Sequence, residues 1–171
     1  TNSTTSTAVG GESIITISGG DIEAMTGGIG GGNANAGKGG NATLTISGGT
    51  INASSINGGN SKKNNGGSAT VLITDGILNT GSIGGGITDS STAKIGSAAV
   101  EITGGEIHGQ VIMDSTNLAS GVECSFKMSG GTIDMSNPNS DYDFSFSEDN
   151  GAVVYIIGSG ESTEEIAQLT G

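Results

Sequence analysis

The sequence lacks several residue types that other folds and functions require. It has no tryptophan, no arginine, one proline and one cysteine. A single cysteine, Cys124, excludes an internal disulfide and a metal site built from cysteines. Five lysines against 17 acidic residues leave a formal charge of -12, which argues against nucleic acid and against an anionic membrane surface. No apolar run has the length of a membrane span, so we expect no membrane insertion.

What the chain has instead is glycine and regularly placed aliphatic residues. Glycine accounts for 34 of the 171 residues, several times its usual share of roughly 7%. Isoleucine, valine and leucine recur at fixed intervals, and a disordered chain has no reason to keep such spacing. The opening residues 1–11 are rich in serine and threonine and are interpreted as a linker. Such spacing indicates an internal repeat.

Five segments of the chain align with one another. They start at Ile15, Leu44, Val71, Val100 and Phe126, at intervals of 29, 27, 29 and 26 residues. In each segment polar and apolar residues alternate, as in a half-buried strand, and a glycine-containing pair then allows a sharp corner. A second short strand follows. The loops 33–43 and 60–70 also match in length and end alike.

This pattern predicts an all-β, single-domain, right-handed parallel β-helix of about five to six coils, with a C-terminal cap. Residues 12–136 would form the coils, and equivalent side chains would stack in three buried columns. The first column is Ile17, Ile46, Ile73, Ile102 and Met128; the second is Ile22, Ile51, Leu78, Ile107 and Ile133; the third is Ile29, Ile56 and Ile83, continued by Val111 or Ile112. An antiparallel sandwich would not explain the equal spacing.

The repeated strand motif, clearest in residues 46–51 (ISGGTI), and the IGGG element at 29–32 resemble a β-helix repeat of Gram-positive bacterial surface and secreted proteins. The resemblance covers about residues 12–135. It implies a polysaccharide-lyase-like architecture, secretion or display at the bacterial cell surface, and carbohydrate binding. Because the shared residues mark corners and core, the resemblance assigns no ligand-binding residue.

An outward-facing polar column is the candidate ligand site. One side chain from each coil contributes, and together they run down one face of the predicted rod. The column is Glu23, Asn52, Asn79, His108 and Asp134. Short polar side chains at the spacing of β-strands could track a polysaccharide by hydrogen bonds. The alternative is that outward positions are simply polar and that the asparagines stack in a structural ladder.

The C-terminal segment, 137–171, is predicted to be a final coil and a cap, with a short helix at 166–169 after a capping-box pattern. Asp141, Asp143 and Asp149 lie in its acidic stretch. Calcium prefers several oxygen ligands, so these three carboxylates are the candidate calcium ligands. The alternative is a solvated acidic loop.

Catalysis is disfavoured by the residues available. A polysaccharide lyase of this shape would use a basic residue, often arginine, and here only lysines exist. Lys38, Lys62 and Lys63 lie in loops and Lys127 in a coil, and no aspartate pair recurs on adjacent coils. The sole histidine, His108, is at an outward position. We therefore expect no enzyme.

The sequence thus predicts a non-catalytic extracellular carbohydrate-binding or adhesion module with a plant or microbial polysaccharide as its partner. It would sit beside further domains of a larger surface protein. The alternative is a purely structural stalk. A lyase-like enzyme is the third and weakest interpretation.

Overall fold

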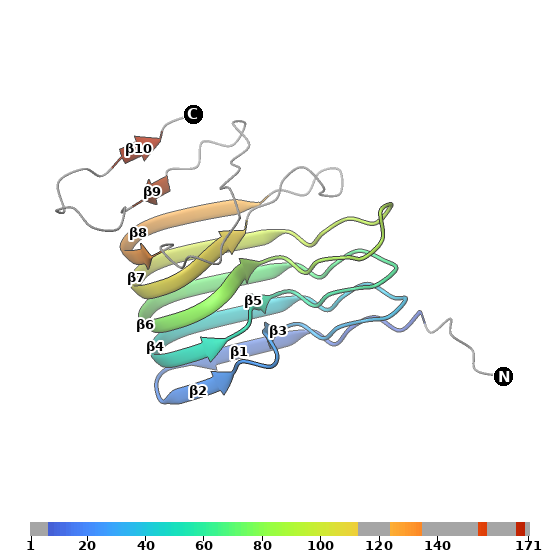
Figure 1. Cartoon of the computed structure of the whole chain (residues 1–171), viewed down its shortest axis with the longest axis horizontal. Helices are drawn as coiled ribbons and strands as arrows, with labels where there is room; N and C mark the ends of the chain where they lie inside the picture. Colours follow the sequence, from blue (N-terminus) through green and yellow to red (C-terminus); the bar gives the residue numbers. More distant parts are fainter. Residues whose placement is uncertain (1–6, 113–123, 135–153, 157–166, 170–171) are drawn as a thin grey trace.

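The computed structural model describes residues 7–112, 124–134, 154–156 and 167–169, and within them there are strands but no helix (Figure 1). The strands are β1 (Ser13–Ile17), β2 (Asp21–Ala24), β3 (Ile29–Gly30), β4 (Ala42–Ala53), β5 (Ile56–Asn57), β6 (Ala69–Gly84), β7 (Ala98–Ile112), β8 (Ser125–Asp134), β9 (Val154–Ile156) and β10 (Ala167–Leu169).

The first eight strands form one sheet that winds as a β-solenoid. Strand β1 pairs in parallel with β4, β4 with β6, β6 with β7, and β7 with β8. The chain therefore makes about four turns from β1 to β8, as the stack of arrows in Figure 1 shows. This confirms the all-β parallel solenoid and excludes the antiparallel sandwich for these residues.

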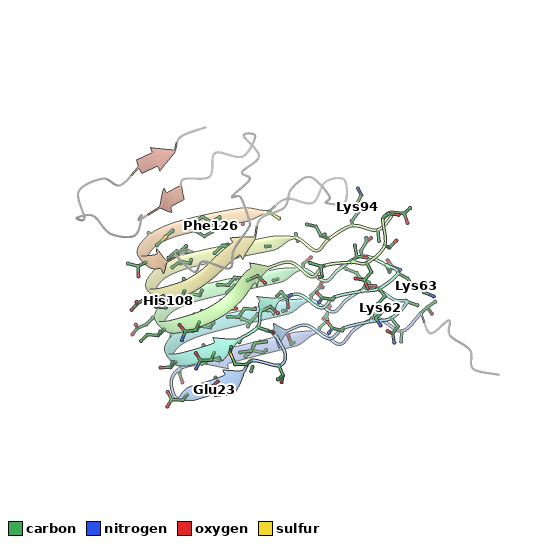
Figure 2. All side chains as sticks on the ribbon, viewed as in Figure 1. Glu23, Lys62, Lys63, Lys94, His108 and Phe126 are labelled. Carbon is green, nitrogen blue, oxygen red and sulfur yellow. The ribbon has the colours of Figure 1, made fainter. Side chains whose placement is uncertain are left out.

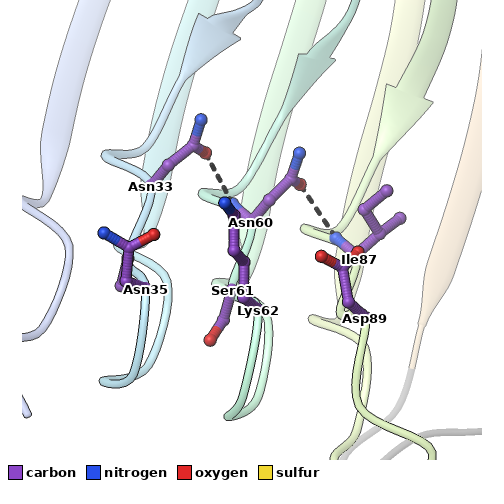
Figure 3. A pocket seen from close by; sticks show the side chains of 8 residues that line it. Asn33, Asn35, Asn60, Ser61, Lys62, Ile87 and Asp89 are labelled. Carbon is purple, nitrogen blue, oxygen red and sulfur yellow. Dashed lines mark hydrogen bonds between the residues drawn. The ribbon is translucent and has the colours of Figure 1, made fainter. Parts of the chain in front are cut away.

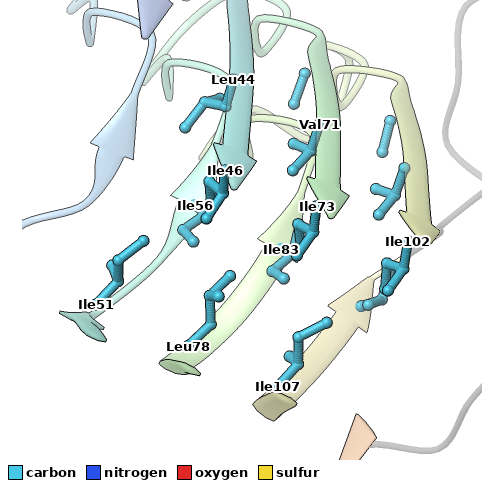
Figure 4. Packing of buried hydrophobic residues seen from close by; sticks show 14 of the residues in the cluster. Leu44, Ile46, Ile51, Ile56, Val71, Ile73, Leu78, Ile83, Ile102 and Ile107 are labelled. Atoms are coloured by element: carbon cyan, nitrogen blue, oxygen red, sulfur yellow. The ribbon is translucent and has the colours of Figure 1, made fainter. Parts of the chain in front are cut away.

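The core contains the three predicted columns (Figure 4). It also contains two columns that were not predicted: Leu44, Val71, Val100 and Phe126, and the smaller Ala42, Ala69 and Ala98. Ile46, Ile73 and Ile102 are register partners and are each 0% exposed. The second column is equally buried in its middle coils, whereas Ile22 and Ile133 at its ends are partly buried. In the third column Ile83 pairs with Val111, which decides between the two candidates left open by the sequence. Burial of each such side chain contributes about 1.5–3 kcal/mol.

Each coil turns its first corner at a glycine. The described residues with positive φ are all glycines: Gly20, Gly48, Gly49, Gly76, Gly105 and Gly131. All of these except Gly48 are the second residue of a predicted corner pair. At Gly49 and Gly76 the φ angles of 95° and 109° disfavour any residue with a Cβ. The corner therefore depends on glycine, as the sequence predicts.

The remainder of each coil is an extended arm that runs out and back to one side of the strands (Figure 1). We call residues 31–40, 58–67 and 85–96 the glycine arm. The sequence suggested only turns and loops here, but the two limbs of the arm pack closely together. A methyl group at Gly59 would lie 2.0 Å from the carbonyl oxygen of Gly32 on the same limb of the preceding coil, and 2.7 Å from Gly40 N on the opposite limb. Glycine is needed because the backbones themselves are in contact.

Hydrogen bonds in the arm alternate between its outgoing and returning limbs. Gly40 N donates to Gly32 O at 2.9 Å, Gly59 N to Gly40 O at 2.8 Å, and Gly67 N to Gly59 O at 2.8 Å. The same alternation continues from Gly67 O through Gly86 to Gly96. The backbone thereby satisfies its own polar groups where no side chain is available to do so.

The predicted helix at 166–169 is wrong. Residues Ala167–Leu169 form β10, which pairs antiparallel with β9. Four residues are too few for a stable helix, because nucleation costs more than so short a segment returns. Pairing with the apolar strand Val154–Ile156 satisfies the backbone instead. The rest of the predicted cap lies outside the described residues.

Candidate functional site

The predicted ligand column is in register along the solenoid. Glu23 pairs with Asn52, Asn52 with Asn79, Asn79 with His108, and His108 with Asp134. The column lies on β2, β4, β6, β7 and β8, and in each coil its residue is in the stretch that follows the glycine corner. The alignment follows from the constant length between corner and column in every coil.

Hydrogen bonds join the first three side chains of this column to one another. Asn52 Nδ2 donates to Glu23 Oε1 at 2.6 Å, and Asn79 Nδ2 donates to Asn52 Oδ1 at 2.6 Å. Further along, His108 Nε2 lies 2.9 Å from Glu106 Oε1. The asparagines therefore form a ladder, and part of their hydrogen-bonding capacity is used within the protein.

The predicted calcium ligands Asp141, Asp143 and Asp149 lie outside the described residues. In the part of the chain that is described, no three His, Cys, Asp or Glu side chains come together as a metal site would require. Calcium binding by the C-terminal segment stays a prediction.

A groove on the glycine arm is the second candidate site (Figure 3). It has a volume of about 330 Å³ and crosses three successive coils. Six of the eight residues that line it have polar side chains: Asn33, Ala34, Asn35, Asn60, Ser61, Lys62, Ile87 and Asp89.

Asn33 and Asn60 occupy equivalent positions along this groove. Asn60 N donates to Asn33 Oδ1 at 2.8 Å, and Ile87 N donates to Asn60 Oδ1 at 3.0 Å. Within the described residues neither Nδ2 group donates a hydrogen bond, and both point away from the backbone in Figure 3. Each of these asparagines therefore offers two N–H donors to a ligand.

Buried contacts hold the floor of the groove. Ser61 is 3% exposed, and its Oγ donates to Gly37 O at 2.8 Å and accepts from Asn64 N at 2.9 Å. Bridges between Ala34 and Ser61, and between Ser61 and Thr88, keep the three coils aligned. The asparagine donors are thus presented by a fixed backbone, which lowers the entropy lost on binding.

Sequence reasoning missed this groove, although a signal was present. The residues Asn33, Asn60 and Ile87 are each 27 residues apart, and the first two of the loops that carry them match in length. That spacing marks equivalent positions in successive coils. It does not reveal that the loops are straight and stacked, because that depends on contacts between the two limbs.

No helix in the described parts of the chain is long and apolar enough to cross a membrane. Comparison with known proteins finds no matching family model, no matching curated protein and no matching solved structure.

Proposed function

We propose that this chain is a non-catalytic polysaccharide-binding or adhesion module of a secreted or surface-displayed bacterial protein. The observation that carries the proposal is the arm groove, where Asn33 and Asn60 present amide donors that no group in the described part of the chain accepts. A polysaccharide repeats its hydroxyl groups along its length, and the groove repeats its donors from coil to coil. Successive amide donors of the groove could therefore bind successive hydroxyl groups of one polysaccharide chain.

The Glu23–Asn52–Asn79 ladder supports a more limited part in binding. Its side chains hydrogen-bond to each other, so a ligand there would meet groups that already have partners. Oxygen atoms with remaining lone pairs could still accept hydrogen bonds from sugar hydroxyls. We therefore place the main contact in the groove and treat the column as a secondary face.

The second candidate function is a structural stalk that holds neighbouring domains apart. The specific observation in its favour is the density of internal bonding: the asparagine ladder on one face and the alternating glycine bonds on the other. Both features stiffen a rod whether or not it binds a ligand.

The substitution Asn60→Asp tests the groove. It keeps the oxygen that accepts from Ile87 N and removes the two N–H donors. Asn64→Asp is the control, because it adds the same charge to the same arm at an exposed side chain outside the groove lining. Retention on cellulose, xylan and an array of plant and microbial glycans would be measured, with calcium and with chelator.

We expect the wild-type chain and Asn64→Asp to be retained by at least one glycan, and Asn60→Asp to be retained much less. Equal retention of Asn60→Asp and Asn64→Asp would contradict binding in the groove. Retention on no glycan in either condition would contradict polysaccharide binding and favour the stalk.

A further inference from the structure

The lysines of this acidic chain are gathered at the outer end of the glycine arm. Four of the five are there, in three successive arm segments: Lys38, Lys62, Lys63 and Lys94. The fifth, Lys127, is on β8 and pairs with Glu101 at 2.6 Å. In Figure 2 Lys62, Lys63 and Lys94 lie on one side of the solenoid, and Glu23 and His108 lie on the opposite side.

Backbone hydrogen bonds place Lys38 and Lys94 at equivalent positions of two coils. The carbonyl oxygens of Lys38, Asn65 and Lys94 accept hydrogen bonds from Gly10 N, Gly39 N and Gly66 N, in that order. These three acceptors therefore hold the same position in successive returning limbs. Neighbouring strands of a sheet are about 4.8 Å apart. Lys38 and Lys94 are therefore about 10 Å apart along the solenoid axis, and Lys62 and Lys63 belong to the coil between them.

The local charge is opposite to that of the whole molecule. Among the arm residues 31–40, 58–67 and 85–96, Asp89 is the only acid beside four lysines, a formal charge of +3 in a chain of -12. Lys38, Lys62 and Lys63 are exposed. A cluster of like charges raises the local concentration of ligands with the opposite charge.

We propose that the lysine end of the arm selects an anionic polysaccharide, laid along the arm groove across three coils. This inference rests on the proposed function, since it names the class of glycan that the groove binds. Lys62 lines the groove together with Asn60, so an ammonium group can meet a carboxylate or sulfate while amides meet hydroxyls. Single-stranded nucleic acid fits less well, because the arm has no aromatic side chain on which a base could stack.

The test uses polygalacturonate and its methyl-esterified form, which differ in charge but share a backbone. Dextran sulfate and unmodified dextran form a second pair, which separates sulfate from carboxylate. Binding of the full chain is measured by calorimetry in about 0.01 M and about 1 M salt, where the Debye lengths are about 30 Å and 3 Å. Chelator is present throughout, so that calcium cannot bridge protein and glycan.

We expect the anionic polymers to bind, and the high salt concentration to weaken their binding. The double variant Lys62→Gln/Lys63→Gln should lose roughly 2- to 30-fold in affinity, from the usual strength of two exposed ion pairs. Lys127→Gln is the matched control and should bind as the wild type does. Both changes affect exposed side chains, and circular dichroism would verify the fold.

Equal binding of neutral and anionic polymers, or undiminished binding by the double variant, would overturn the lysine selection while leaving polysaccharide binding intact. Tighter binding of single-stranded DNA than of any glycan would overturn it too. Failure to bind any of the four polymers, together with an empty glycan array, would contradict the proposed function itself.

Discussion

At the residue scale, two residue types build this protein by opposite means. Isoleucine fills the space between strands, and glycine removes the space between the limbs of the arm. Ile73 is 0% exposed, whereas Ile77 on the same strand is 42% exposed. This pair separates the effect of burial from that of residue type.

Ile73→Ala should lower the free energy of unfolding by about 2–5 kcal/mol, because it removes buried methyl groups and leaves a cavity. Ile77→Ala should cost no more than about 1 kcal/mol, through lost strand preference. Urea denaturation measures the free energy of unfolding of both variants, and its dependence on urea concentration should be the same as for the wild type. Equal losses for the two variants would contradict a core organised in columns.

Gly59→Ala should destabilise the protein by about 1–3 kcal/mol or more, as overpacking does. The added methyl group would lie 2.0 Å from Gly32 O and 2.7 Å from Gly40 N, and backbone atoms cannot move aside as a side chain does. Gly27→Ala is the control, because a methyl group added there would have no atom within 4 Å beyond its chain neighbours. The melting temperature of Gly59→Ala should be clearly lower than that of Gly27→Ala. An unchanged melting temperature for Gly59→Ala would mean that the limbs are not in close contact.

At the element scale, register matters more than the composition of any one strand. Every strand pair from β1 to β8 is parallel, and equivalent residues of successive coils face each other. Side chains with matching hydrogen-bonding groups can then form ladders across coils. The Glu23–Asn52–Asn79 ladder is the clearest of these.

Asn52→Val tests whether that ladder stabilises the sheet. Valine has the higher strand preference, so propensity alone predicts a gain in stability. Loss of two side-chain hydrogen bonds, each worth about 0.5–1.5 kcal/mol net, predicts a decrease instead. We expect denaturant unfolding to show a decrease of about 1 kcal/mol. Thr50→Val, at the neighbouring outward position of β4, should show no decrease; a more stable Asn52→Val would refute the ladder's contribution.

At the scale of the whole molecule, the solenoid is a one-dimensional array in which each coil contacts only its neighbours. The same backbone hydrogen bond recurs from coil to coil. It joins Ser13 N to Asn41 O, Ala42 N to Ser68 O, and Ala69 N to Ser97 O. A complete coil can therefore be removed without disturbing the register of the others.

Deletion of residues 42–68 joins Asn41 directly to Ala69 and should leave a shorter protein that still folds. Its unfolding should remain cooperative, with a lower free energy and a smaller denaturant slope, because less surface is buried. Deletion of residues 42–60 is the control: it places Ser61, an arm residue, where a strand begins. That variant should not show cooperative unfolding, and failure of the 42–68 deletion to fold would contradict a modular solenoid.

The sequence by itself determined the solenoid, its corners and its core. Equal spacing of Ile46, Ile73 and Ile102 can be read locally, because each coil repeats the same strand–corner–strand pattern. The polar column was predictable for the same reason, since the length between the corner and the column is constant. A short terminal segment offered no such repetition, and there the helix predicted at 166–169 was wrong.

Only the tertiary structure decided the form of the arm and, with it, the groove. Glycine pairs show that a backbone can turn or approach another backbone closely, but not which one it approaches. The partners of Gly59 are Gly32 and Gly40, both in the preceding coil, with Gly32 on the same limb and Gly40 on the opposite one. That contact straightens the arm, aligns Asn33 with Asn60 and gathers the lysines at its end. These are long-range consequences of packing, and no local pattern encodes them.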